Sequence, residues 1–303
     1  MNALRRVTSS QRGMMRALRR TPVIGTVLAV QRRYGDDEGA QLASTITYSA
    51  FLSLFPLLLL AFSSIGILMR DPASRAHWVE RLSNAIPGLK PMIGDNVSAL
   101  SRTAAAAGIA GLIALAWTGT GVVKSAGNAA SKVFGVRPHG GIKSYAWALS
   151  SLAILGVLGL VSTGAGTLVA GFGGGRMWAL AVSWVVWLAL DSGVFLIAYR
   201  ILTQRRGPPF RDLWPGAVLC GAAWTLLKGI GVWYAQRTVA HAQAVYGAFA
   251  ATVGVLVMLS LISKIWVYGA ALNEVLLERR WDASEQKAIN LARHRAARAR
   301  TGA

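Results

Sequence analysis

Long apolar runs without a charged residue alternate with short basic stretches along most of the chain. Residues 39–69, 103–123, 145–175, 177–190 and 238–263 contain no Asp, Glu, Lys or Arg. About 20 mainly apolar residues in a helix are enough to cross the hydrocarbon core of a bilayer. The pattern predicts an all-α fold, a polytopic membrane helix bundle with six transmembrane helices. These spans are expected near residues 46–69, 104–124, 145–170, 178–199, 213–234 and 247–277.

The composition favours a membrane protein over a soluble one. The mean hydropathy is +0.45, and of the 303 residues 54% are hydrophobic and 15% are charged. A soluble domain of this length needs a polar surface around its core, so it has no place for this many long apolar segments. The single cysteine, Cys220, excludes an intrachain disulfide and a zinc site with several thiolates.

Basic residues outside the spans are divided unevenly between the two predicted sides. The N-terminal segment, the second and fourth loops and the C-terminal tail hold 22 Lys and Arg residues, and the other three loops hold 7. Because positively charged loops stay in the cytoplasm, both termini are expected to be cytoplasmic. Attraction to anionic phospholipids then accounts for the net charge of +20, and no specific nucleic-acid partner is expected.

The chain is expected to form one transmembrane domain, residues 36–278, between two basic segments. Residues 1–35 carry eight arginines beside a rough apolar stripe, which predicts an amphipathic helix on an anionic membrane surface. A disordered tail remains equally open for residues 1–12. The extracytoplasmic loop, 70–103, is apolar enough to form short helices that lie on the outer membrane face or cap the bundle. Residues 279–303 are expected to be a basic cytoplasmic tail, frayed or disordered.

Three charged residues, Lys228, Lys264 and Asp191, lie inside predicted spans. A charge at the bilayer centre costs about 2.5–3.5 kcal/mol on insertion scales, so it normally faces the protein interior or a wet cavity. Counting along the helices places Asp191 and Lys264 at similar depths and leaves Lys228 nearer the outer face, without an acidic partner. One interpretation is a structural Asp191–Lys264 ion pair, with Lys228 reaching outward. The other is a polar cavity for an anionic substrate such as a lipid headgroup.

Two further residues and the small-residue faces are candidates for a role. Glu274, near the end of the last span, is either an interfacial acid or part of the substrate site. Pro56, inside the first span, removes a helix hydrogen bond, and the resulting kink is either a gate or a packing detail. Faces with small residues such as Gly156 and Gly159 permit close helix packing and a homo-oligomer without requiring one.

Short motifs in a fixed order resemble the YihY/BrkB-like family of inner-membrane proteins. They are residues 43–57 (ASTITYSAFLSLFPL), Asn128, residues 133–136 (VFGV), Arg205-Arg206 ahead of residues 210–212, residues 216–217, Lys228, residues 246–248, residues 269–271 and Glu274. The resemblance runs from about residue 30 to 280. It implies six membrane helices and a multi-pass location in the bacterial plasma (inner) membrane, with no settled activity. Lys264 and Asn273 depart from the family pattern.

Members of this family have carried a ribonuclease BN-like label, which the residues do not favour. A metal-dependent ribonuclease needs clustered His and carboxylate ligands. The four histidines lie in four different extramembrane segments, and the chain has 12 acidic residues. There is no GxSxG motif, and no histidine lies in a predicted span to serve as a base. We therefore expect no enzyme activity, no catalytic residue, no metal site and no cofactor.

Transport or translocation of an anionic envelope molecule, lipid-like ones included, is the function that the intramembrane cations favour. Lys228, Lys264, Asp191 and Glu274 would bind the substrate along its path. The alternative is a non-transporting membrane scaffold that organises envelope machinery through its basic tails. The expected partners are membrane lipids, above all anionic phospholipids, and an anionic or amphiphilic substrate.

Overall fold

The computed structural model describes residues 22–68, 104–136, 143–172, 177–203, 208–238 and 247–301. Throughout these ranges the chain is helical, with short turns between helices. The helices are α2 (Pro22–Asp36), α3 (Gly39–Leu68), α7 (Ala104–Val133), α8 (Lys143–Phe172), α9 (Met177–Leu202), α10 (Phe210–Thr238) and α11 (Gly247–Thr301). The all-α class is therefore confirmed for this part of the chain. The expectations for residues 1–21 and for the loop 70–103 lie outside the described residues.

Five of the helices are long and apolar enough to cross a membrane. These candidate spans are Gly39–Ala61, Ala106–Val133, Lys143–Ala165, Val182–Leu202 and Thr252–Trp281. They correspond to five of the six predicted spans. The sixth, 213–234, is helical as part of α10, but α10 carries Arg211, Asp212, Lys228 and Arg237 and is not among the five.

Several helices continue past the ends of the apolar runs. α7 extends to Val133, where Gly135 adopts a φ of 62° and the Val136 amide donates to the Ser131 carbonyl at 2.8 Å. This is a glycine cap, which satisfies carbonyls at the end of the helix. α11 continues to Thr301, so the expected frayed or disordered tail is a helical extension of the last span. Residues 278–301 contain no Gly or Pro, and therefore nothing in them breaks the helix.

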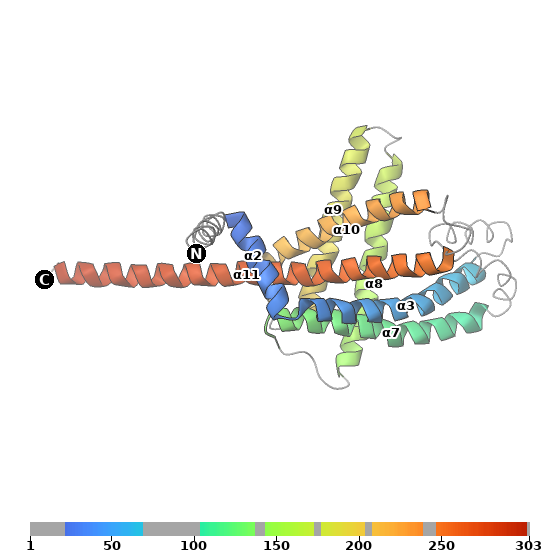
Figure 1. The fold of residues 1–303 in the computed structure, drawn as a ribbon, viewed down its shortest axis with the longest axis horizontal. Coiled ribbons are helices and arrows are strands. Elements are labelled where there is room, and N and C mark those ends of the chain that lie inside the picture. Colours follow the sequence, from blue (N-terminus) through green and yellow to red (C-terminus); the bar gives the residue numbers. More distant parts are fainter. Residues whose placement is uncertain are drawn as a thin grey trace, which may run out of the picture.

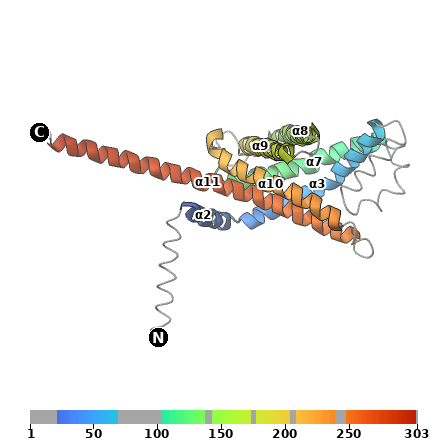
Figure 2. The same ribbon diagram turned by 90° about the horizontal axis from the view of Figure 1, so that it is seen from above.

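The helices form a lengthwise group and a hairpin that lies across it. In Figure 1, α3, α7, α10 and the first half of α11 run broadly alongside one another, while α8 and α9 cross them steeply. In Figure 2 the α8–α9 hairpin is seen nearly end-on, and α2 lies on the other side of α11. The second half of α11 extends alone beyond the bundle. This crossed arrangement decides which charged residues meet.

A compact core joins α7, α9 and α11 near the end where α2 docks. The Tyr199 and Trp266 rings stack with centroids 4.1 Å apart, and the Tyr199 hydroxyl donates to the Trp266 carbonyl at 2.6 Å. The Trp266 indole N–H donates to the Ala126 carbonyl at 3.1 Å. Elsewhere the helices expose large apolar side chains such as Trp117 and Leu160, as expected for surfaces that face lipid chains.

Candidate functional site

A buried carboxylate, Asp191, is the meeting point of three helices. Asp191 of α9 is 5% exposed, and the Lys228 ammonium of α10 lies 2.6 Å from its Oδ2 atom. The Thr225 hydroxyl donates to the same oxygen at 3.0 Å, and the Ser162 hydroxyl of α8 donates to Oδ1 at 3.0 Å. One cation and two hydroxyl groups therefore compensate the buried negative charge, which would otherwise be costly in this environment.

The Lys228 ammonium also lies over the rings of two tryptophans. Its Nζ atom lies 5.5 Å from the centroid of the Trp187 ring and 5.9 Å from that of Trp224, within the range of a cation–π interaction. The Lys228 side chain remains 28% exposed. The ammonium group thus contacts a carboxylate and two aromatic rings, and the side chain that carries it is partly exposed.

The predicted Asp191–Lys264 pair is wrong, as is the prediction that Lys228 lacks an acidic partner. Within the described residues Asp191 bonds to Ser162, Thr225 and Lys228, whereas Lys264 is exposed on α11. The depth count assumed six parallel helices. Because α9 lies across α10 and α11 (Figure 1), equal numbers of residues from the helix ends do not bring side chains to the same place.

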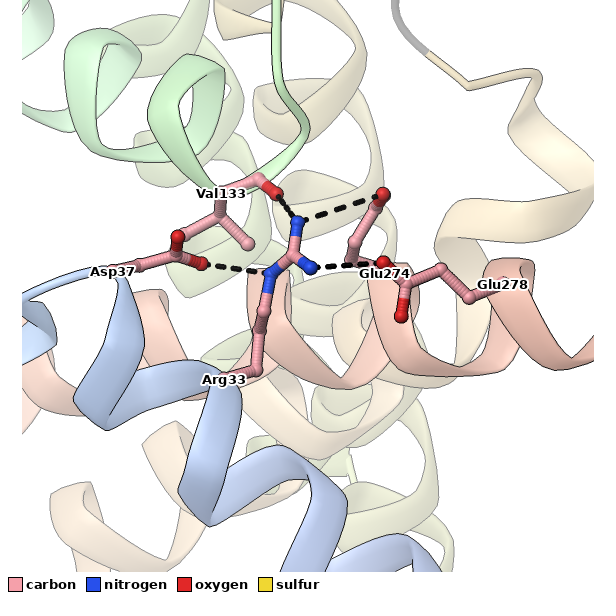
Figure 3. A network of polar contacts seen from close by, with 5 residues as sticks. All are labelled: Arg33, Asp37, Val133, Glu274 and Glu278. Atoms are coloured by element: carbon pink, nitrogen blue, oxygen red, sulfur yellow. Dashed lines mark hydrogen bonds and ion pairs between the residues drawn. The ribbon is translucent and has the colours of Figure 1, made fainter.

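A second polar cluster is centred on Arg33 of α2 (Figure 3). Its guanidinium contacts Asp37 at 2.9 Å, Glu278 at 2.8 Å and Glu274 at 3.8 Å. It also donates to the Val133 carbonyl at the end of α7 at 2.9 Å, a position where a helix leaves its carbonyls without internal partners. One side chain therefore connects α2, the end of α7 and α11.

Glu274 belongs to this second cluster. Its side chain is 14% exposed and faces Arg33 (Figure 3), and it takes no part in the described contacts of Asp191. The structure thus places Glu274 and Asp191, both predicted to bind the substrate, in different clusters. Their roles in substrate binding remain predictions. Arg33 itself was not predicted as a site residue. Its position four residues before Asp37 was the available signal, because residues at that spacing on a helix can form an ion pair.

The turn between α2 and α3 is held by contacts on both sides of Arg33. The Tyr34 and Tyr268 rings stack with centroids 4.0 Å apart, and the Tyr268 hydroxyl donates to Gln31 at 2.9 Å. Burial, and to a lesser extent Tyr268, raises the pKa of Tyr34. Glu38 adopts a φ of 57° and accepts a hydrogen bond from Lys132 at 2.8 Å, which lowers the pKa of the Glu38 carboxyl. α2 is therefore fixed against the bundle.

Replacing Arg33 by methionine is expected to release α2. The loss of its charged hydrogen bonds should lower the local stability of α2 by about 2 kcal/mol, or roughly thirtyfold in its opening equilibrium. Hydrogen exchange of the α2 amides in nanodiscs measures this change. Arg32→Met is the matched control, since Arg32 is exposed on the same helix. Equal exchange in the two variants would contradict the role assigned to Arg33.

α10 and α11 pack closely against each other at two glycines. A Cβ atom on Gly216 would overlap the Gly269 carbonyl oxygen, and a Cβ on Gly269 would overlap the ends of Cys220 and Tyr199. The Gly216 amide also donates to the Asn273 side-chain oxygen at 2.6 Å. Asn273 therefore acts at the helix crossing.

Pro56 and a shallow depression on α7 complete the candidates. Pro56 is buried in α3, its carbonyl oxygen would lie 3.4 Å from a Cβ on Gly111 of α7, and α3 curves along its length (Figure 1). The curve and the packing contact are visible, while a gating role remains a prediction. The depression on α7 is lined by Ala110, Ile113, Ala114, Trp117 and Thr118 and contains no charge. No group of three or more His, Cys, Asp or Glu that could hold a metal ion occurs in the described ranges.

Comparison with known families identifies the chain. The model of the family described as "Virulence factor BrkB" matches residues 30–295, which is nearly the whole chain. The chain belongs to the BrkB family. The family resemblance inferred from the motifs is thereby confirmed. With its five long apolar helices, this BrkB-family chain is a multi-pass membrane protein.

Similarity beyond the family model is modest. An uncharacterized protein of Dickeya dadantii (strain 3937) is 29% identical over 243 residues, which cover 71% of this BrkB-family chain and 73% of the relative. No solved structure matches the chain. The contacts of each residue in the structure are therefore the evidence for its role.

The motifs that indicated the resemblance coincide with helix ends and crossings. Residues 133–136 form the glycine cap of α7, and Val133 supplies the carbonyl that Arg33 binds. Residues 216–217 and 269–271 lie where α10 and α11 pack closely against each other. These motifs are thus explained by packing, whereas Lys228, Asp212 and Glu274 are motif residues that form ion pairs.

Proposed function

We propose that this BrkB-family protein moves an anionic envelope molecule, including lipid-like ones, across the membrane. The observation that carries the proposal is the Asp191–Lys228 pair, a charged contact among apolar helices. Ionisable residues inside membrane helices commonly mark substrate or ion pathways. Here the accessible part of Lys228 offers an anion-binding group that Asp191 neutralises when no substrate is bound.

The position of the pair gives the proposal a mechanism. Asp191 bonds to Ser162 within the α8–α9 hairpin and to Thr225 and Lys228 on α10, so it links the crosswise hairpin to the lengthwise group. An anionic substrate that competes for Lys228 weakens this link. Substrate binding is thereby coupled to movement of the hairpin against α10, because the substrate prefers the state in which Lys228 is released.

The proposal includes the full topology and location. α10 is taken as the sixth span, with both termini in the cytoplasm and the protein in the bacterial plasma membrane. The 22 to 7 distribution of Lys and Arg supports this orientation. We further propose that the protein is not an enzyme and uses no cofactor, on the basis of its scattered histidines and few acidic residues.

A translocation assay tests the role of Lys228. Purified protein is reconstituted into phosphatidylcholine liposomes that contain a trace of fluorescent phosphatidylglycerol, and dithionite reports movement of the probe between leaflets. Wild-type protein is expected to accelerate this movement. Lys228→Gln should reduce the acceleration by at least about tenfold, the effect of losing roughly 1.4 kcal/mol of substrate interaction.

Lys124→Gln is the matched control for this assay. Lys124 is also a lysine inside a candidate span, but its ammonium lies 3.0 Å from the centroid of the Tyr145 ring, away from the described contacts of Asp191. Movement that is equally fast in wild type and Lys228→Gln would overturn the proposed role of Lys228. Absence of any acceleration by wild type would overturn phospholipid translocation itself.

A scaffold is the second candidate, and the form of α11 favours it. This helix has 55 residues, and its second half extends past the other helices (Figure 1). Its last part is rich in Arg and Ala, a composition suited to acidic envelope partners. In this case, removal of residues 282–303 would abolish the cellular function while Lys228→Gln would preserve it.

A further inference from the structure

One face of α11 is exposed over its first part and ends in a lysine. Val253, Val257, Leu261 and Lys264 are all exposed, and Val257 reaches 54%. Their spacings of four, four and three residues place them in one line on the helix surface. The line therefore consists of three apolar side chains followed by one cation.

The continuation of this face is covered by α2. Tyr268 follows Lys264 by four residues, which is one helical turn. Its ring stacks on Tyr34, and its hydroxyl donates to Gln31. Lys264 therefore lies where the covered part of the α11 face meets its open part.

The outward side of α2 indicates where this boundary lies relative to a membrane. Ile24, Val27 and Leu28 are exposed, and the same helix face continues with the exposed Arg32. A helix with such a face lies between lipid headgroups and acyl chains. Lys264 precedes Tyr268 by one turn of α11, which is about 6 Å. It is then just below the headgroup level, and the apolar line extends from it into the acyl region.

The charge of Lys264 is not balanced within the described residues. Three acidic residues of the bundle form ion pairs with other cations: Asp191 pairs with Lys228, and Glu274 and Glu278 pair with Arg33. A cation on a lipid-facing surface is costly at this depth unless an anion neutralises it. An amphiphile with an anionic head and an apolar chain matches both parts of the surface.

We propose that this face of α11 binds an anionic phospholipid. Its phosphate contacts the Lys264 ammonium beside α2, and an acyl chain lies along Leu261, Val257 and Val253. This site differs from the Asp191–Lys228 contact and does not depend on transport.

Native mass spectrometry of the full-length protein, titrated with phosphatidylglycerol or phosphatidylcholine, tests the site. Wild type is expected to bind phosphatidylglycerol more tightly. Lys264→Gln should lower the affinity for phosphatidylglycerol about fivefold and leave phosphatidylcholine unchanged, whereas Lys264→Arg restores the preference. Lys124→Gln is the charge-matched control. Lys228→Gln removes the separate contact proposed for transport, and in that background Lys264→Gln should still lower the affinity for phosphatidylglycerol by the same factor, so the two proposals fail independently.

Three results would overturn this site. The first is an unchanged phosphatidylglycerol affinity in Lys264→Gln. The second is displacement of the lipid by excess inorganic phosphate, which would indicate an anion site that makes no use of the apolar line. The third is a disulfide between copies of a Leu261→Cys variant in membranes, which would show that a second copy covers this face. Cys220 is buried and does not compete in that experiment.

Discussion

Replacing Gly216 by alanine is expected to cost more than about 3 kcal/mol of stability, the upper range for inserting a methyl group into a packed contact. The added Cβ meets the Gly269 backbone carbonyl and the Asn273 side chain. A backbone atom cannot move aside by changing its rotamer, so α10 and α11 must separate. The loss is measured as the amount of folded protein in detergent and as its thermal midpoint.

Gly254→Ala is the control for this substitution. Gly254 lies on α11, and a Cβ atom there has no neighbour within 4 Å. Alanine favours a helix over glycine by about 1 kcal/mol, so this variant should be as stable as wild type or slightly more stable. If Gly216→Ala is as stable as Gly254→Ala, the close approach of α10 and α11 is wrong.

Removal of the Asp191 carboxylate is expected to destabilise the protein by about 3 kcal/mol, the lower part of the range for breaking a buried ion pair. The lower part applies because Lys228 is partly exposed. Asp191→Leu leaves the ammonium beside two tryptophans without its counter-ion. The double variant Asp191→Leu with Lys228→Met removes both charges and should recover most of the loss, because a pair of apolar residues needs no compensation.

The free energies of unfolding of wild type, the two single variants and the double variant form a thermodynamic cycle. A coupling energy above about 1 kcal/mol is expected for partners in direct contact. Strictly additive losses would show that Asp191 and Lys228 act independently, and both the described pair and the proposed transport mechanism would then lose their basis.

The helices were largely predictable, since each apolar run is too long for any other element of a membrane protein. Their ends were less so. α7 continues past residue 124 because residues 125–133 are compatible with a helix and only Gly135 ends it. α11 continues to Thr301 for a related reason, as no Gly or Pro interrupts its charged part. Hydrophobicity reports where a helix can contact lipid, and helix length depends in addition on caps and breakers.

The charged residues were identified correctly as unusual, but their partners were not. Lys228, Lys264 and Asp191 were singled out because a charge in an apolar run needs compensation. The choice between Lys228 and Lys264 as the partner of Asp191 depends on how α9 crosses α10, and the pattern along one chain contains no such angle. The Arg33 cluster was missed for the same reason, because its members come from α2, α7 and α11.

The unbroken course of α11 has a mechanical consequence. The part beyond Trp281, where the candidate span ends, continues as helix to Thr301 and measures about 30 Å at 1.5 Å per residue. Because no joint separates this arm from the bundle, a pull or twist at its tip reaches the Gly216–Gly269 crossing and the α2 contact as a torque. A partner bound at the tip would therefore be held at a fixed distance from the bundle, and a force on that partner would be transmitted to these contacts.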